Sequence, residues 1–222
     1  NQSRRQRQMC IRDRGNEGSF NEGTPYAPRS PYASSKAASD HLVRAWQETY
    51  KLPTVITNCS NNFGPYQFPE KLIPLTILKL IRGEKVPLYG DGENIRDWLY
   101  VGDHVNALLQ VAEKGKVSET YCIGGHGEMT NKNIVNEICK IMDKIYIDKA
   151  PHSKLIYFVE DRPGHDRRYA IDPKKLKNEL GWKVEKTFSK NLELTVRWYL
   201  ENIDWCKKVL KNQSLNRRGL NL

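Results

Sequence analysis

The sequence contains no apolar run that approaches the ~20 consecutive residues required to span a bilayer. No signal-peptide pattern opens it either, so we expect a cytoplasmic protein with no membrane partner. The five cysteines form no Cys-x-x-Cys pair, and the five histidines lack metal-ligand spacing. This pattern disfavours a disulfide framework and a zinc site, and it predicts a reducing compartment and no bound metal.

Positive charge is scarce where a nucleic-acid-binding face would need it. The formal net charge is +10, but residues 1–14 carry +4 and residues 211–222 carry +3. Only +3 is left for residues 15–210. A folded body so nearly balanced has no obvious basic stripe, so we expect no nucleic-acid partner for it.

The two ends of the chain differ from the rest. Residues 1–14 (NQSRRQRQMCIRDR) show no helical or strand period. They are either a basic arm that binds nucleic acid or sequence foreign to a truncated gene, such as a translated adapter. We prefer the second interpretation and treat them as a non-native or disordered segment outside the predicted fold. Residues 211–222 are predicted to be a polar tail.

The clearest local pattern is SPYASSK at residues 30–36. Ser30 suits a helix N-cap and Pro31 the first helical position, and no further Gly or Pro occurs up to residue 50, which predicts a long helix. Tyr32 and Lys36 then share one face. A tyrosine that acts as a base near neutral pH needs its pKa lowered by about three units, and an ammonium nearby favours the phenolate. Taken alone, this spacing is more typical of a surface pair without chemistry.

The same helix carries a second, apolar stripe roughly 120° around its axis from the tyrosine–lysine face. One helix can therefore serve both a site and a packing partner. The stripe consists of Ala38, Leu42, Ala45, Trp46 and Thr49.

Strand and helix patterns alternate along the remaining chain, which predicts an α/β fold with some parallel pairing. The expected strands are residues 52–58, 86–89, 96–101, 120–123 and 155–159. The first of the expected helices begins within residues 68–74 and ends near residue 82. The others cover residues 103–114, 132–145, 173–180 and 189–202, and Asn131 is the expected N-cap of the helix 132–145.

Two polar loops are candidates for ligand binding. Residues 59–66 (CSNNFGPY) follow a buried strand, where ligands of open α/β sheets collect, although a plain turn explains them equally well. Residues 161–169 (DRPGHDRRY) are rich in charge around a Pro-Gly break. They are either a solvated loop or an anion clamp, because arginine forks match phosphate oxygens.

Five stretches together resemble the extended short-chain dehydrogenase/reductase family over residues 18–205: SPYASSK, NCSNNFGPYQFPEKLIP, VPLYGDGENIRDWLYV, ETYCIGG and EDRPGHDRRYAID. The resemblance implies that residues 15–210 are the C-terminal part of a nucleotide-sugar dehydratase. A partial NAD-binding Rossmann domain would be interleaved there with a smaller α/β substrate-binding domain. It also implies a homodimer.

The implied activity is a redox-neutral dehydration of dTDP-glucose on bound NAD, as in rhamnose-type deoxysugar biosynthesis. Tyr32, assisted by Lys36, would take the proton of the sugar 4-hydroxyl. Lys36 would also hold the nicotinamide ribose, and Asn62 would contact the nicotinamide end of NAD.

The resemblance also implies a set of substrate-binding residues. Arg96 and Arg162 suit the pyrophosphate by charge, whereas Leu72, Pro87 and Leu88 could equally be core or turn residues. The full set is Asn61, Lys71, Leu72, Pro87, Leu88, Tyr89, Arg96, Asn131, Asp161, Arg162, Pro163, Gly164 and His165.

Two features of the family pattern are missing. The chain has no strand, Gly-x-x-Gly-x-x-Gly turn and helix to receive the NAD pyrophosphate. It also lacks the Thr-Asp-Glu acid–base triplet before the tyrosine, for which Asp13 is no credible substitute. We therefore expect an inactive C-terminal half to two-thirds of such an enzyme. An epimerase or decarboxylase of the same family and a cofactor-free binding module remain alternatives.

Overall fold

The computed structural model describes residues 7–8, 18–28, 30–161 and 165–210. The chain divides into two compact units, each assembled from three separate stretches. The first unit comprises residues 1–62, 95–128 and 166–185, and the second comprises residues 63–94, 129–165 and 186–222. Two of the points at which the chain passes between the units fall within short strands, β3 (Asn61–Phe63) and β7 (Glu128–Thr130).

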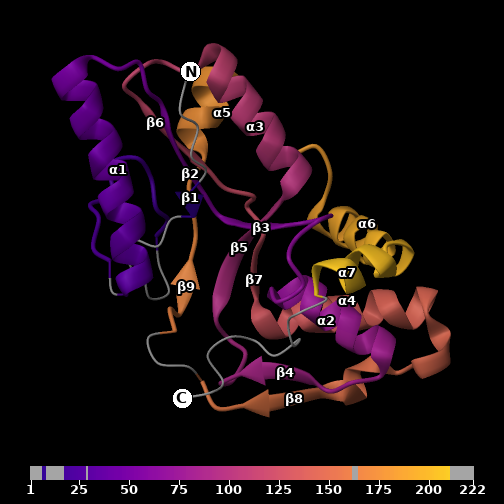
Figure 1. Ribbon diagram of the computed structural model, residues 1–222. Helices are drawn as coiled ribbons and strands as arrows, with labels where there is room; N and C mark the ends of the chain where they lie inside the picture. The colour runs from indigo at the N-terminus through magenta and orange to yellow at the C-terminus, as the bar shows by residue number, and fades with distance from the viewer. Residues whose placement is uncertain (1–6, 9–17, 29, 162–164, 211–222) are drawn as a thin grey trace. The chain divides into compact units, whose positions relative to one another are not determined.

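The first unit is built on a parallel sheet with the strand order β1-β2-β6 (Figure 1). In its register, Ile56 of β2 pairs with Thr120 of β6. A further parallel pairing joins β5 to β9. The elements are β1 (Arg7–Gln8), α1 (Pro31–Tyr50), β2 (Ile56–Cys59), β5 (Ile95–Tyr100), α3 (Val101–Lys114), β6 (Thr120–Ile123), β9 (Arg168–Tyr169) and α5 (Lys174–Leu180).

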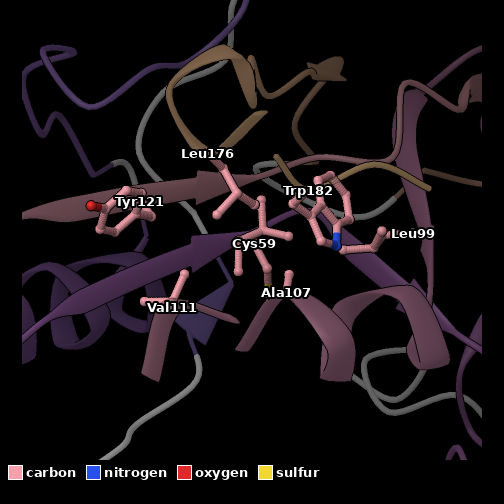
Figure 2. Packing of buried hydrophobic residues seen from close by; sticks show 8 residues of the cluster. Cys59, Leu99, Ala107, Val111, Tyr121, Leu176 and Trp182 are labelled. Atoms are coloured by element: carbon pink, nitrogen blue, oxygen red, sulfur yellow. The ribbon is translucent and has the colours of Figure 1, made fainter. Parts of the chain in front are cut away.

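Side chains of β6 alternate between two hydrophobic clusters, as the two-residue period of a strand requires. Tyr121 and Ile123 belong to a cluster that gathers around Cys59 and includes residues of α3 and α5 (Figure 2). Cys122, which lies between them in the sequence, packs with Phe20 in a separate cluster. The sheet therefore has α3 and α5 on one face, which leaves its other face for α1.

The second unit packs three helices together beside a two-stranded parallel sheet, in which β4 pairs with β8. Ile134, Val135 and Ile138 of α4 are fully buried, and their spacing places them on one face of the helix. The elements are α2 (Leu72–Arg82), β4 (Val86–Tyr89), α4 (Asn131–Ile145), the short 3-10 helices η1 (Ile147–Lys149) and η2 (His152–Leu155), β8 (Ile156–Val159), α6 (Phe188–Glu201) and α7 (Ile203–Val209).

The alternation of strands and helices with parallel pairing confirms the predicted α/β class. The predicted cap of α4 is wrong, because Thr130 Oγ1 accepts a hydrogen bond of 3.1 Å from the Asn133 N–H and Asn131 is the first helical residue. Helix α7 was not predicted, since so short a segment carries no clear period. No described helix combines the length and apolarity needed to cross a bilayer.

Residues 7–8 also differ from the expectation that residues 1–14 lie outside the fold. They form strand β1, in which Arg7 pairs with Asn58 and Gln8 with Cys59. Strand pairing uses backbone groups, so two residues can extend the edge of β2 without any side-chain pattern. The other residues of this segment and the predicted tail 211–222 lie outside the described residues.

Candidate functional site

Tyr32 and Lys36 lie in the first turns of α1. Pro31 is the first helical residue, and Ser30 Oγ caps the helix by accepting a hydrogen bond of 3.1 Å from the Ala33 N–H. Lys36 Nζ lies 5.4 Å from the centroid of the Tyr32 ring, which confirms the predicted shared face. The Tyr32 side chain is 56% exposed. The helix thus presents a phenol whose ring is attracted to an adjacent ammonium.

Polar side chains anchor α1 to the sheet. Tyr26 Oη donates a hydrogen bond of 2.9 Å to Oδ2 of the buried Asp40 and accepts one of 3.4 Å from Asn58 Nδ2. Arg44 Nη2 of the same helix donates to Thr120 Oγ1 at 2.9 Å. Burial raises the pKa of Tyr26, and the neighbouring Asp40 carboxylate raises that pKa further. Directional hydrogen bonds therefore set the rotation of the helix that carries the tyrosine–lysine pair.

Asn62 lies in β3, just beyond the carboxyl end of β2, and follows the half-buried Asn61. Asn62 Nδ2 lies 3.3 Å from both the Ser60 carbonyl oxygen and Cys59 Sγ. Asn62 Oδ1 lies 2.7 Å from Nδ1 of His104, a residue of α3 that is 1% exposed. Burial lowers the pKa of His104 to about 4, so the imidazole is neutral at physiological pH.

Arg96 is a buried cation of β5. Its Nη2 donates a hydrogen bond of 2.8 Å to the Asp166 carbonyl oxygen, and Nη1 donates one of 2.7 Å to the Ile95 carbonyl oxygen. Its guanidinium carbon lies 5.0 Å from the centroid of the Tyr169 ring. Arg96 therefore holds residues 166–169, which directly follow the predicted substrate loop in the sequence. Its role at a pyrophosphate remains a prediction.

Asp97, the next residue of β5, faces the turn that follows β6. Its carboxylate accepts hydrogen bonds from the Gly125 N–H (3.1 Å) and the Gly127 N–H (2.9 Å), and burial raises its pKa. A Cβ atom on Gly125 would lie 2.2 Å from the Trp98 carbonyl oxygen, so only glycine fits there. Asp97 thus fixes the turn at residues 125–127. A carboxylate within a buried strand was the sequence feature that could have indicated this role.

In the second unit, several predicted substrate residues also serve the core. Leu72 is 7% exposed and Leu88 is 1% exposed, and Pro87 is buried beside it in β4. Their role in substrate binding stays a prediction. Lys71, by contrast, is exposed at the start of α2, where its Nζ lies 3.4 Å from Glu70 Oε1.

The structure brings together Tyr89, Asp161 and His165 in the second unit. His165 Nδ1 lies 2.7 Å from Asp161 Oδ1, and the rings of Tyr89 and His165 are 6.5 Å apart. Asp161 also packs against Gly90, where a Cβ atom would lie 3.0 Å from Asp161 Oδ2. Buried Asn131 lies elsewhere in this unit, and its N–H donates to the Asn94 carbonyl oxygen at 3.0 Å. The predicted site residues Arg162, Pro163 and Gly164 lie outside the described residues.

Sequence reasoning missed the residues that hold the candidate side chains in place. His104 contacts Asn62 from 42 positions away, and Asp166 contacts Arg96 from 70 positions away, with Tyr169 three residues further along the chain. No spacing rule covers such pairs, because the fold alone brings them together. Two sequence features could have indicated these residues. His104 lies in register with the apolar face of α3, and Tyr169 is the aromatic residue at the end of the charged loop.

Comparison with known proteins shows a similarity over most of the chain. The family model described as GDP-mannose 4,6 dehydratase matches residues 14–195. A dTDP-glucose 4,6-dehydratase from Shigella flexneri is 56% identical over 190 residues, which cover 86% of this chain and 53% of that protein. A dTDP-glucose 4,6-dehydratase from Neisseria meningitidis is 54% identical over 210 residues, which cover 92% of this chain and 59% of that protein.

A solved structure shows the same fold. The crystal structure of dTDP-glucose 4,6-dehydratase from Bacillus anthracis in complex with NAD matches with a TM-score of 0.82 and 49% identity, over 89% of this chain and 60% of that chain. The chain therefore spans little more than half the length of the curated relatives that it matches.

Proposed function

Because the chain belongs to the GDP-mannose 4,6 dehydratase family, we propose that it is part of an NAD-dependent dehydratase that converts dTDP-glucose to dTDP-4-keto-6-deoxyglucose and water. The observation that carries this proposal is the 56% identity to a dTDP-glucose 4,6-dehydratase. The contact of Tyr32 with Lys36 on one face of α1 supports it. The pathway would be rhamnose-type deoxysugar biosynthesis.

The side chains of the first unit suit the nicotinamide end of NAD. A phenol, an ammonium and a carboxamide, from Tyr32, Lys36 and Asn62, together offer donors and acceptors for ribose hydroxyls and a nicotinamide amide. We assign the ribose to Lys36 and the nicotinamide end to Asn62. When bound, NAD supplies the hydride acceptor and donor of a reaction that is redox-neutral overall.

Tyr32 is the base of the first step in this proposal. Its phenolate oxygen takes the proton of the sugar 4-hydroxyl, and the positive charge of Lys36 favours the phenolate form. The 56% exposure of the Tyr32 side chain leaves its ring accessible to a ligand of this chain. Water then leaves across C5 and C6 of the sugar.

The remaining predicted residues bind the nucleotide sugar in this proposal. Support comes from the buried guanidinium of Arg96 and from the Tyr89–His165–Asp161 group, which offers an aromatic face beside polar atoms. The other members of the set are Asn61, Lys71, Leu72, Pro87, Leu88, Asn131, Arg162, Pro163 and Gly164.

We propose a homodimer in which α1 packs against a second copy of the chain. Leu42 is 60% exposed and Trp46 is 54% exposed, although both belong to the apolar stripe of the helix. Ala38, Ala45 and Thr49 of the same stripe are exposed as well. Large apolar side chains in one exposed row are typical of a surface that packs against a partner.

We also place the protein in the cytoplasm. The thiols of Cys59, Cys122, Cys139 and Cys206 are free and buried. Free buried thiols are typical of proteins from a reducing compartment. Accumulation of the tagged protein in an oxidising compartment would contradict this assignment.

The test uses an extended protein, in which residues 18–222 are fused to the part of the Shigella flexneri relative that the match leaves uncovered. Incubation with NAD and dTDP-glucose is expected to yield the 4-keto-6-deoxy product. The matched control is Tyr32→Phe, which removes only the phenolic oxygen. A 4-epimer or binding without turnover would overturn the proposal and favour an epimerase or a binding module, and carbon dioxide released from a nucleotide-linked hexuronic acid offered in a parallel assay would favour a decarboxylase.

A further inference from the structure

His104 lies on the buried face of α3. The side chains of His104, Ala107 and Val111 follow one another along this face, and each is at most 4% exposed. Ala107 and Val111 pack into the hydrophobic cluster around Cys59. An apolar side chain of similar size would fill the position of His104 without losing hydration. The imidazole adds a hydrogen bond to Asn62, which an apolar side chain could not make.

The direction of that hydrogen bond follows from the groups at both ends of the Asn62 amide. Nδ2 faces the Ser60 carbonyl oxygen, which can only accept, so Nδ2 is the donor there. Oδ1 therefore faces His104 and must accept, which requires the proton of the neutral imidazole to be on Nδ1. The opposite tautomer would place two lone pairs 2.7 Å apart.

We propose that His104 is a positioning residue for the cofactor site, because its Nδ1–H holds the carboxamide of Asn62 in the single orientation that meets the nicotinamide end of NAD. This inference rests on the proposed function. With Oδ1 held by His104 and Nδ2 held by Ser60, the amide cannot flip. A ligand then meets a carboxamide whose orientation is already fixed and does not have to order it on binding.

The first part of the test is spectroscopic and needs no cofactor. The 222-residue chain is labelled with ¹⁵N-histidine, and the resonance that disappears in the His104→Asn variant is assigned to His104. We expect the Nδ1–H tautomer, unchanged between pH 8 and roughly pH 5, because burial keeps the ring neutral. An Nε2–H tautomer, or titration near the ordinary histidine value of about 6.5, would overturn the proposal.

The second part compares two substitutions in the extended protein. The side-chain amide nitrogen of Asn in His104→Asn occupies the place of Nδ1 and keeps a donor to Asn62, whereas His104→Leu removes the donor and keeps the bulk. We expect the dissociation constant for NAD to be about three- to tenfold higher in His104→Leu, because one net hydrogen bond is lost. His104→Asn should restore most of the affinity.

The readouts separate this inference from the proposed function. If the unsubstituted extended protein neither binds NAD nor forms product, the proposed function fails, and the tautomer experiment still reports on His104. If it binds NAD and His104→Leu binds equally well, the positioning role of His104 is wrong. Should His104→Leu not fold, His104→Asn must still bind NAD like the unsubstituted protein, and a large loss there would also contradict the proposal.

Discussion

The guanidinium of Arg96 lies over the ring of Tyr169, with its carbon 5.0 Å from the ring centroid. The same ring is held in place, because Tyr169 Oη donates a hydrogen bond of 2.5 Å to Asp166 Oδ2. Arg96 in turn donates to the Asp166 main-chain carbonyl. These contacts form a closed set, so the cation has a fixed position before any anion binds. A preorganised guanidinium is suited to bidentate recognition of a phosphate.

We predict that Arg96→Ala lowers both substrate affinity and stability. Loss of a hydrogen bond to a charged group weakens nucleotide-sugar binding by about 1.5–3 kcal/mol. The free energy of unfolding should fall by a similar amount, about 1–3 kcal/mol, because the partly buried carbonyl groups of Ile95 and Asp166 lose their donor. Calorimetric titration of the extended protein with dTDP and urea denaturation measure the two effects separately.

The matched control for Arg96 is Tyr169→Phe. It keeps the ring under the guanidinium and removes only the hydroxyl that bonds to Asp166. We expect its dTDP affinity to remain within about threefold of the unsubstituted value, because the substitution keeps the ring under the guanidinium and leaves the donors of Arg96 unchanged. If Arg96→Ala loses stability with no change in dTDP affinity, Arg96 is only a structural residue.

We predict that the free energy of unfolding falls at acid pH because of His104. Its pKa is about 4 in the folded protein, whereas an unfolded histidine titrates near 6.5. Between these values the unfolded state binds more protons, so stability is full above about pH 6.5 and falls as the pH is lowered towards 4. The loss from this residue alone is on the order of 3 kcal/mol. Urea denaturation at pH 7 and at pH 4.5 measures it.

The control for this pH dependence is His104→Asn, which cannot titrate. The difference in unfolding free energy between the two pH values should be smaller in this variant than in the unsubstituted chain. Other groups also titrate in this window, but their contributions cancel in the comparison. Identical pH slopes in the two proteins would show that His104 does not resist protonation in the folded state.

Elements with strong local signals were predictable from the sequence. Helix α1 begins at Pro31 after the cap Ser30, as its capping residues indicated. Strands β4 (Val86–Tyr89) and β6 (Thr120–Ile123) have the predicted bounds, and a glycine directly follows each of them. Thr130 and Asn131 are adjacent residues with similar N-cap preference, so composition could not decide between them.

The contacts within the candidate site were predictable only where they are local. Tyr32 and Lys36 are one helical turn apart, and helix geometry alone places them on one face. The pairing of Asn62 with His104 depends on how β3 and α3 pack in the first unit. Sequence patterns report periodicity within an element, whereas such pairings depend on the register between elements.

We predict that the substitution Trp46→Glu, in the exposed apolar stripe of α1, prevents the chain from forming a dimer. Trp46 is 54% exposed and its ring centroid lies 4.8 Å from that of Tyr50, so the two rings form one apolar surface. A carboxylate there would have to be desolvated on packing against a second copy. Light scattering of the extended protein at micromolar concentration should show a dimer, and the variant should be monomeric.

Gln47 offers a matched control on the same helix, because its Oε1 accepts a hydrogen bond from Thr54 and the residue lies off the stripe. Gln47→Glu adds the same charge as Trp46→Glu and should leave the dimer intact. A monomeric unsubstituted protein would remove the proposed role of the stripe. Equal dissociation by both substitutions would attribute the effect to net charge.

The last prediction is that the 222-residue chain by itself does not turn over dTDP-glucose, although it contains Tyr32 and Lys36. Holding reactants in position can supply ~7–11 kcal/mol of barrier reduction, and here it requires NAD to be held against C4 of the sugar. The sequence contains no Gly-x-x-Gly-x-x-Gly turn to place a pyrophosphate at a helix N-terminus. Without that anchor, the phenol–ammonium pair has no cofactor beside it. Calorimetric titration of the purified chain with NAD, together with an assay for the keto product, measures both properties. Micromolar NAD affinity accompanied by product would show that the 222 residues of this chain suffice for catalysis.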